Sequence, residues 1–150
     1  MKRMIPLLLA LALLAGCGGK EAKTADPQEI VDAYLESQAF SDHLEALDSD
    51  IALPLLGIDP EDVSDSQVYL SEGATAEELT VITAVDGDAA ERVNEALSQH
   101  VADQRTAVES YQPGEVEKLD NAVRRTAGNV VVLMVAADWE FAAGIDGILS

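Results

Sequence analysis

An unbroken apolar run near the end of the chain constrains the fold most strongly. Residues 130–136 read VVVLMVA, without the alternation of polar and apolar side chains that a strand with one wet face shows. We therefore expect an interior strand that is covered on both faces. Residues 79–85 (LTVITAV) also carry apolar side chains on both faces and predict a second interior strand.

Turn signals add further strands to these two. Gly128-Asn129 separates residues 121–127 from residues 130–136 and predicts a tight hairpin, because glycine accepts the positive φ angle of such a turn. Residues 67–71 (QVYLS) predict a short strand. Together these segments predict a small, mostly antiparallel sheet of about four strands.

Helix signals surround the strands. Asp26-Pro27-Gln28-Glu29 combines an N-cap acid, a proline at the first helical position and a glutamate at N3, which predicts a helix start. A capping box at residues 88–91 opens the longest expected helix, which runs to about Tyr111. Shorter or interrupted helices are expected over three further segments: residues 50–58, 113–119 and 139–149.

The longest expected helix has an apolar stripe and a charged face. The stripe, which we expect to pack on the sheet, consists of Val93, Leu97, Val101, Val108 and Tyr111. Residues 27–150 therefore predict a single α+β domain, in which one long and two or three shorter helices pack on the sheet.

Three of the six aromatic side chains lie near expected ends of helices and strands. These are Tyr111, Trp139 and Phe141. Core packing is the interpretation we favour. An exposed set would instead indicate a docking patch for a small ligand or a protein, since aromatic side chains offer large contact area at low entropic cost.

The first residues have the layout of an export signal. Lys2 and Arg3 precede an uncharged apolar run at residues 5–15, which is shorter than the roughly 20 residues that a membrane-spanning helix needs. The run ends in Leu14-Ala15-Gly16-Cys17, which resembles the lipobox of bacterial lipoproteins.

The lipobox resemblance implies a lipid-anchored protein. It implies that the sulfur of Cys17 receives a diacylglyceryl group, and that a peptidase recognising Leu14, Ala15 and Gly16 cuts before Cys17. Residues 1–16 would then be a signal peptide and residues 17–26 a flexible tether. We accordingly expect a location on the extracytoplasmic side of the cell membrane, held by lipid.

The charge of the chain limits its partners. With 28 acidic and nine basic residues, the formal net charge is −19, which excludes nucleic acid and a polybasic membrane contact. Removing residues 1–16 takes away Lys2 and Arg3 and leaves a charge of −21. An envelope protein or a basic peptide is therefore the expected partner, besides the membrane that holds the lipid.

We find no catalytic motif and expect no cofactor. The chain has a single cysteine, and its two histidines are too few for a common structural zinc site. His100 lies near the apolar stripe of the long helix, so we interpret it as a boundary residue with one hydrogen bond rather than as a general base. No catalytic residue is assigned.

One acidic segment is a weak candidate for a calcium site. It contains Asp59, Glu61, Asp62 and Asp65, and calcium requires several oxygen ligands close together. The spacing differs from that of an EF-hand loop. An N-cap at Asp59 followed by Pro60 and first-turn acids explains the segment better, so we assign no metal site.

The order of several segments resembles one family. These segments are LLGIDPEDV at residues 55–63, GATAEELTVITAVD at residues 73–86, Tyr111-Gln112-Pro113 after the long helix, and AGNVVVLMVAAD at residues 127–138. Together with the lipobox they resemble bacterial lipoproteins of the family called domain of unknown function 4358. Val130 departs from the aromatic residue that often follows the Gly-Asn pair. The resemblance implies export, anchoring and a small α+β domain, and it transfers no activity.

One favoured function and two alternatives follow from these observations. We favour a noncatalytic, lipid-anchored domain that binds an envelope component. The alternatives are an envelope enzyme that uses carboxylates in a groove and a calcium-binding module. The enzyme would require a concave pocket with two acids in unlike environments.

Overall fold

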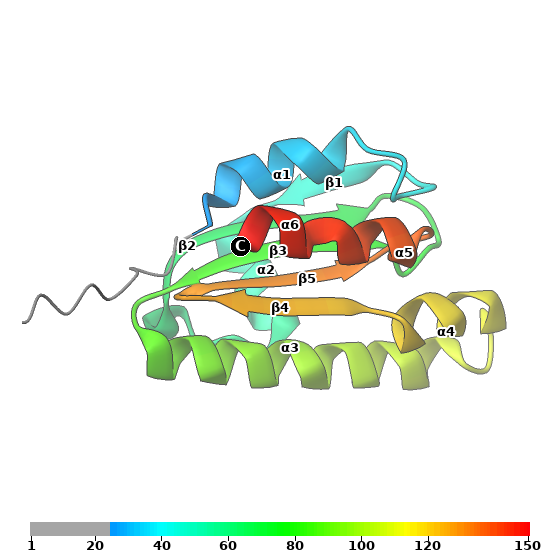
Figure 1. The fold of residues 1–150 in the computed structure, drawn as a ribbon. Coiled ribbons are helices and arrows are strands. Elements are labelled where there is room, and N and C mark those ends of the chain that lie inside the picture. The colour runs from blue at the N-terminus through cyan, green and yellow to red at the C-terminus, as the bar shows by residue number, and fades with distance from the viewer. Residues whose placement is uncertain (1–24) are drawn as a thin grey trace, which may run out of the picture.

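A five-stranded antiparallel sheet lies between two layers of helices in the computed structural model, which describes residues 25–150 (Figure 1). Its strand order is β1-β2-β3-β5-β4, and each neighbouring pair is antiparallel. The strands are β1 (Leu44–Leu47), β2 (Val63–Ser71), β3 (Glu78–Ala84), β4 (Val123–Ala127) and β5 (Val130–Val135).

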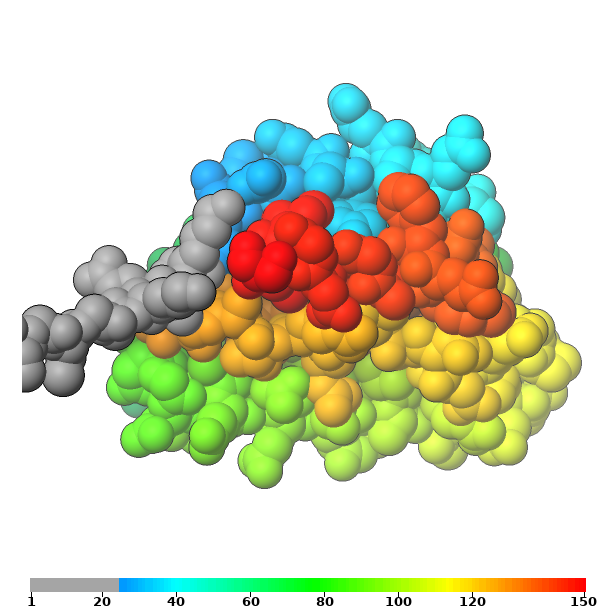
Figure 2. Space-filling model, in the orientation of Figure 1, coloured from blue at the N-terminus to red at the C-terminus, as the bar shows by residue number. Residues whose placement is uncertain are grey.

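The helices are divided between the two faces of the sheet. One face is covered by α2 (Ser49–Leu56), α3 (Gly87–Val108) and α4 (Pro113–Asp120), with the 3-10 turn η1 (Pro60–Asp62) beside α3. The other face is covered by α1 (Pro27–Leu35), α5 (Trp139–Ala142), η2 (Ala143–Ile145) and α6 (Asp146–Leu149). In the space-filling view, the C-terminal segment fills the surface between α1 and β4 (Figure 2).

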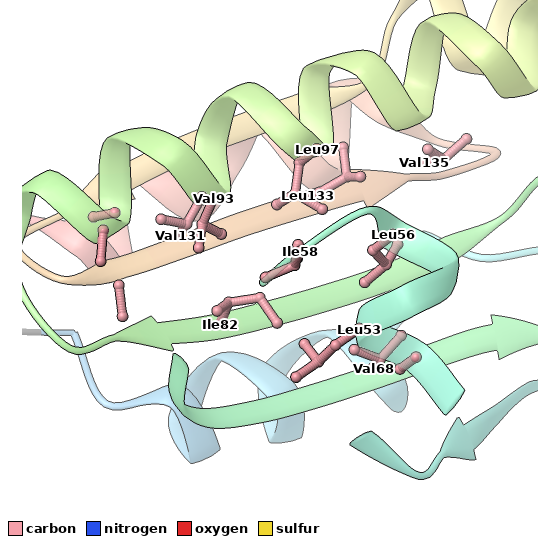
Figure 3. Packing of buried hydrophobic residues seen from close by; sticks show 14 of the residues in the cluster. Leu53, Leu56, Ile58, Val68, Ile82, Val93, Leu97, Val131, Leu133 and Val135 are labelled. Atoms are coloured by element: carbon pink, nitrogen blue, oxygen red, sulfur yellow. The ribbon is translucent and has the colours of Figure 1, made fainter. Parts of the chain in front are cut away.

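Each face of the sheet has its own hydrophobic core. On the α3 side, Val93 and Leu97 point toward Val131 and Leu133 of β5, and α2 packs nearby over Val68 (Figure 3). The core on the α1 side is built from residues of α1, β3, β5 and the C-terminal segment. Both cores and all five strands lie within residues 25–150, so this segment contains a complete folding unit.

The predicted interior strands are confirmed. Residues 130–136 are all buried, and β3 lies between β2 and β5 with its apolar side chains shared between the two cores. The hairpin is also confirmed, since Gly128 joins β4 to β5 with a φ of 58°. Asp26 caps α1 as predicted, accepting a hydrogen bond from the amide of Gln28.

The α+β class is confirmed, with one strand more than expected. The sequence did not indicate β1, because Leu44-Glu-Ala-Leu is too short to display a period and is composed of good helix formers. Strand β2 also starts four residues earlier than predicted, at Val63. The polar residues near its start border an irregularity in the pairing between Val63 and Asp65, which hid this part of the strand.

The long helix begins and ends earlier than predicted. Its N-cap is Asp86, whose carboxylate accepts a hydrogen bond of 2.7 Å from the amide of Ala89, and Asp88 lies in the first turn. Because α3 ends at Val108, Tyr111 leaves the apolar stripe and is 66% exposed. Phe141 is exposed as well, and its ring forms a T-shaped pair with the ring of Tyr34. The expectation of core packing is therefore wrong for both aromatic side chains.

The position of the cap predicts unequal effects of two similar substitutions. Asp86→Ala should lower the free energy of unfolding by about 1 kcal/mol, because the amide of Ala89 loses its acceptor. Asp88→Ala removes a first-turn acid without a cap bond and should cost only a few tenths of a kcal/mol. Urea denaturation of residues 25–150 measures both, and equal losses would contradict the assignment of the cap.

Candidate functional site

Two adjacent glutamates are buried where the chain enters β3. Glu77 and Glu78 directly precede the apolar part of the strand, and both side chains are almost completely enclosed. Their partners come from different parts of the fold. Glu77 binds the segment after α1 and helix α4, whereas Glu78 binds helix α3.

Glu77 is held by four hydrogen bonds. It accepts from the amide of Ser41 at 2.8 Å, from the hydroxyl of Ser41, from the amide of Asp42 at 3.1 Å, and from the amine of Lys118 at 2.7 Å. Burial alone would raise the pKa of Glu77, but the hydrogen bonds from Lys118, Ser41 and Asp42 outweigh it and lower the pKa. The carboxylate is thus ionised and connects α4 to the segment after α1.

Asp42 extends this polar cluster toward the loop between β2 and β3. Hydrogen bonds from the Ser71 hydroxyl and the His43 amide hold the pKa of Asp42 below its ordinary value. Thr75 also donates to Asp42. A side chain at Gly73 would place its Cβ only 2.5 Å from the Asp42 carboxylate, so this loop approaches closely because residue 73 is glycine.

Two of the segments on which the family resemblance rests meet at this end of the sheet. The side-chain amide of Gln112 donates to the carbonyl of Ala74 at 2.6 Å, and the amide of Ala76 donates to Glu115 at 2.8 Å. Tyr111 borders a shallow hollow of about 290 Å³ between these two segments. The residues 73–78 and 111–115 therefore form one continuous surface, although the whole of α3 separates them in sequence.

Glu78 forms a buried pair with His100 of α3. The Nε2 atom of His100 lies 2.7 Å from a carboxylate oxygen of Glu78, and the hydroxyl of Thr80 donates to the other oxygen at 2.9 Å. Burial alone would lower the pKa of the His100 imidazole, but the hydrogen bond and charge of Glu78, together with the charge of Asp103, raise it. His100 has the one hydrogen-bond partner that its position in the sequence led us to expect, but it is buried rather than at the boundary of the apolar stripe.

An open groove lies between α2 and α3. It has a volume of about 910 Å³, and His100 contributes to its lining. A smaller hollow of about 290 Å³ near η1 shares Gly57, Arg92 and Ala96 with this groove. The other residues that line the larger groove are Pro54–Leu56 of α2 and residues of α3 between Glu95 and Gln104.

The four acids considered for calcium have separate roles. Asp59 caps η1 as predicted, accepting from the amide of Glu61 at 2.9 Å. Asp62 binds Arg92 at 2.6 Å, and this hydrogen bond lowers the pKa of Asp62. Asp65 is exposed on β2. Within residues 25–150, no group of three or more histidine, cysteine or acidic side chains is arranged to hold a metal ion.

The residues proposed for lipidation lie outside the described part of the chain. Leu14, Ala15, Gly16 and Cys17 all precede residue 25. Among the helices of residues 25–150, none has both the length and the apolar content needed to cross a membrane.

Fold and site together define a small α+β domain with buried polar pairs at one end of its sheet and an open groove between α2 and α3. A family model described as "Domain of unknown function (DUF4358)" matches residues 23–136, and the chain belongs to this family. No curated protein and no solved structure matches it.

Sequence reasoning did not single out Glu77, Glu78 or Lys118. A signal was present, because two acids directly precede an interior strand and a buried carboxylate requires partners. The identity of those partners could not be read from the pattern.

The Glu78–His100 pair predicts a pH-dependent contribution to stability. Because the pKa of His100 is raised in the folded state, its contribution is complete below the pKa of an unfolded histidine, about 6.5, and is lost as the pH rises through the folded pKa. The difference in unfolding free energy between the wild type and His100→Gln should therefore shrink from pH 5.5 to pH 9. Urea denaturation measures it, with His43→Gln, an exposed histidine, as control. A difference that stays constant over this range would refute the role of the pair.

The Glu77–Lys118 pair predicts a large loss of stability when its cation is removed. Lys118→Met should cost about 2–3 kcal/mol, because it leaves the buried carboxylate without its cation. This expected loss of stability is smaller than for a fully buried ion pair, because the lysine side chain is 15% exposed. Thermal and urea unfolding measure the loss, and Glu117→Gln on the exposed side of α4 is the control. A cost equal to that of the control would show that the pair is not stabilising.

Proposed function

We propose that the chain is a lipid-anchored extracytoplasmic lipoprotein whose domain binds another component of the cell envelope without catalysing a reaction. The observation that carries this proposal is the lipobox Leu14-Ala15-Gly16-Cys17 behind a short apolar run and two basic residues. The folded domain begins soon afterwards, with α1 starting at Pro27. Residues 17–24 then act as the tether between lipid and domain. This is two residues shorter than expected, because Ala25 is buried in the core on the α1 side and Asp26 caps α1.

The anchor is strong because it carries more than one acyl chain. Each buried methylene contributes about 0.8 kcal/mol, and a single acyl chain gives only reversible attachment. The acidic domain itself is repelled by anionic headgroups. A flexible tether of eight residues reaches roughly 14–17 Å, so the domain is held near the membrane without lying on it.

The contacts of the buried acids favour binding over catalysis. Glu77 is occupied by Ser41, Asp42 and Lys118, and its carboxylate serves to join elements of the fold. The groove between α2 and α3, by contrast, presents side chains that protein groups do not cover. A surface of this kind is suited to a docked partner.

The groove also favours a second candidate, an envelope enzyme. His100 lines the groove and Glu78 orients its imidazole, which is the arrangement of a general base with an orienting acid. The two acids of the groove, Glu95 and Asp103, are however both exposed and have like environments. They are therefore not the two acids in unlike environments that such an enzyme requires. Binding is accordingly the function that we propose.

The anchoring is tested by following Cys17. The full chain is expressed in a bacterium with labelled palmitate, and mass spectrometry determines the N-terminal residue and its modification. We expect label in the membrane fraction and a mature chain that begins at a diacylglyceryl Cys17. Cys17→Ala should abolish the label and retain the leader, whereas Gly18→Ala, just outside the lipobox, should leave both unchanged. A wild-type chain that is unlabelled and retains its leader would overturn the proposal.

A further inference from the structure

We infer that the groove between α2 and α3 docks a short, basic and amphipathic segment of a protein partner. This inference rests on the proposed binding function and names the surface and the chemistry of the partner. The groove and the hollow beside η1 share Gly57, Arg92 and Ala96, so they form one trough along α3. From Arg92 to Gln104 the helix rises about 18 Å, which is the length of three helical turns of a partner.

One wall of the trough is apolar and uncovered. Ile51 and Leu55 of α2 are 57% and 51% exposed, the largest exposures of aliphatic side chains on this layer. They are four residues apart in one helix, so they lie on the same face and form a single strip. Leu55 lines the groove next to Pro54, and Ile51 extends the strip beyond the groove lining. Covering this strip would release the water that it orders, which favours a partner with apolar side chains.

The opposite wall is acidic. Glu95 and Asp103 of α3 line the groove, and among residues 25–150 neither forms an ion pair with a basic side chain. They are eight residues apart on one ridge of the helix, about 12 Å along its axis. At the η1 end the trough continues past Asp59 and Glu61. The wall therefore offers two carboxylates about 12 Å apart on α3, with further acids at the η1 end.

The basic residues of the trough do not offset this charge. His100 is paired with the buried Glu78 at 2.7 Å. Arg92 binds Asp62 through two of its nitrogens, with a shortest distance of 2.6 Å, so its charge is already compensated. The whole chain carries −19, and a second copy would meet like charge in the trough. The occupant that fits both walls is a segment with two cationic side chains about 12 Å apart and apolar side chains between them.

The binding test uses three synthetic 14-residue peptides as probes. One alternates lysine and leucine with helical periodicity, one has glutamate in place of lysine, and one has serine in place of leucine. We expect residues 25–150 to bind the lysine–leucine peptide at low salt, measured by calorimetry. Affinity should fall by tenfold or more for each of the other peptides and should weaken as salt is added. Failure of the lysine–leucine peptide to bind would overturn the inference.

Matched variants locate the binding surface. The double substitution Glu95→Gln with Asp103→Asn should weaken binding at least tenfold, and Leu55→Ser should weaken it as well. The control, Glu36→Gln with Glu140→Gln, makes the same change in net charge on exposed residues of the opposite helical layer. It should leave affinity within twofold. Equal weakening by both double variants would show attraction to the acidic surface as a whole and would refute the groove.

Two readouts separate this inference from the proposed anchoring. Amide shifts in NMR spectra should map to α2 and to residues 92–104 of α3, and shifts confined to other elements would overturn the inference. A chain that is lipidated at Cys17 but fails these peptide tests refutes only the groove. A chain that binds the peptide in the groove but is not lipidated refutes only the anchoring.

Discussion

Strands β3 and β5 have no face that can remain in water, and the other elements are arranged to cover them. Apolar side chains of these two strands belong to both hydrophobic cores, so a helical layer is needed on each side of the sheet. The long helix α3 supplies most of one layer, while α1 and the C-terminal segment together supply the other. The short helix α2 completes the α3 layer, and the groove lies open between the two helices.

The polar pairs at the start of β3 are a consequence of this two-sided burial. The side chains of Glu77 and Glu78 lie in a region that water does not reach. An unpaired carboxylate there would lower the stability of the fold. Each is compensated by a cation or an imidazole from a different element, Lys118 of α4 and His100 of α3. The two pairs thereby fix α4 and α3 against the same end of the sheet. Because α3 forms one wall of the groove, the Glu78–His100 pair also sets the position of that wall.

The sequence predicted best those features that depend on neighbouring residues. The unbroken apolar run at residues 130–136, the Gly128 turn and the Asp26 cap are local signals, and the structure confirms each of them. The location of the α3 cap was ambiguous because both Asp86 and Asp88 satisfy the local rule. The site could not be predicted in the same way, since Ser41 and Lys118 lie 36 and 41 residues from Glu77 in sequence. Only the fold brings them together.

The position of the tether and the negative charge of the domain both support the proposed lipoprotein. The described chain begins beside α1, on the layer opposite to the one that contains α2 and α3, so a tether joined there leaves the groove accessible (Figure 1). The negative charge that repels the domain from anionic lipid also attracts basic segments over a distance of about 8 Å at physiological salt. An apolar strip beside spaced carboxylates then selects among those segments, because charge alone would accept any of them. In the binding that we propose, long-range attraction brings a basic segment near, and burial of Leu55 and Ile51 against its apolar side chains decides which segment stays bound.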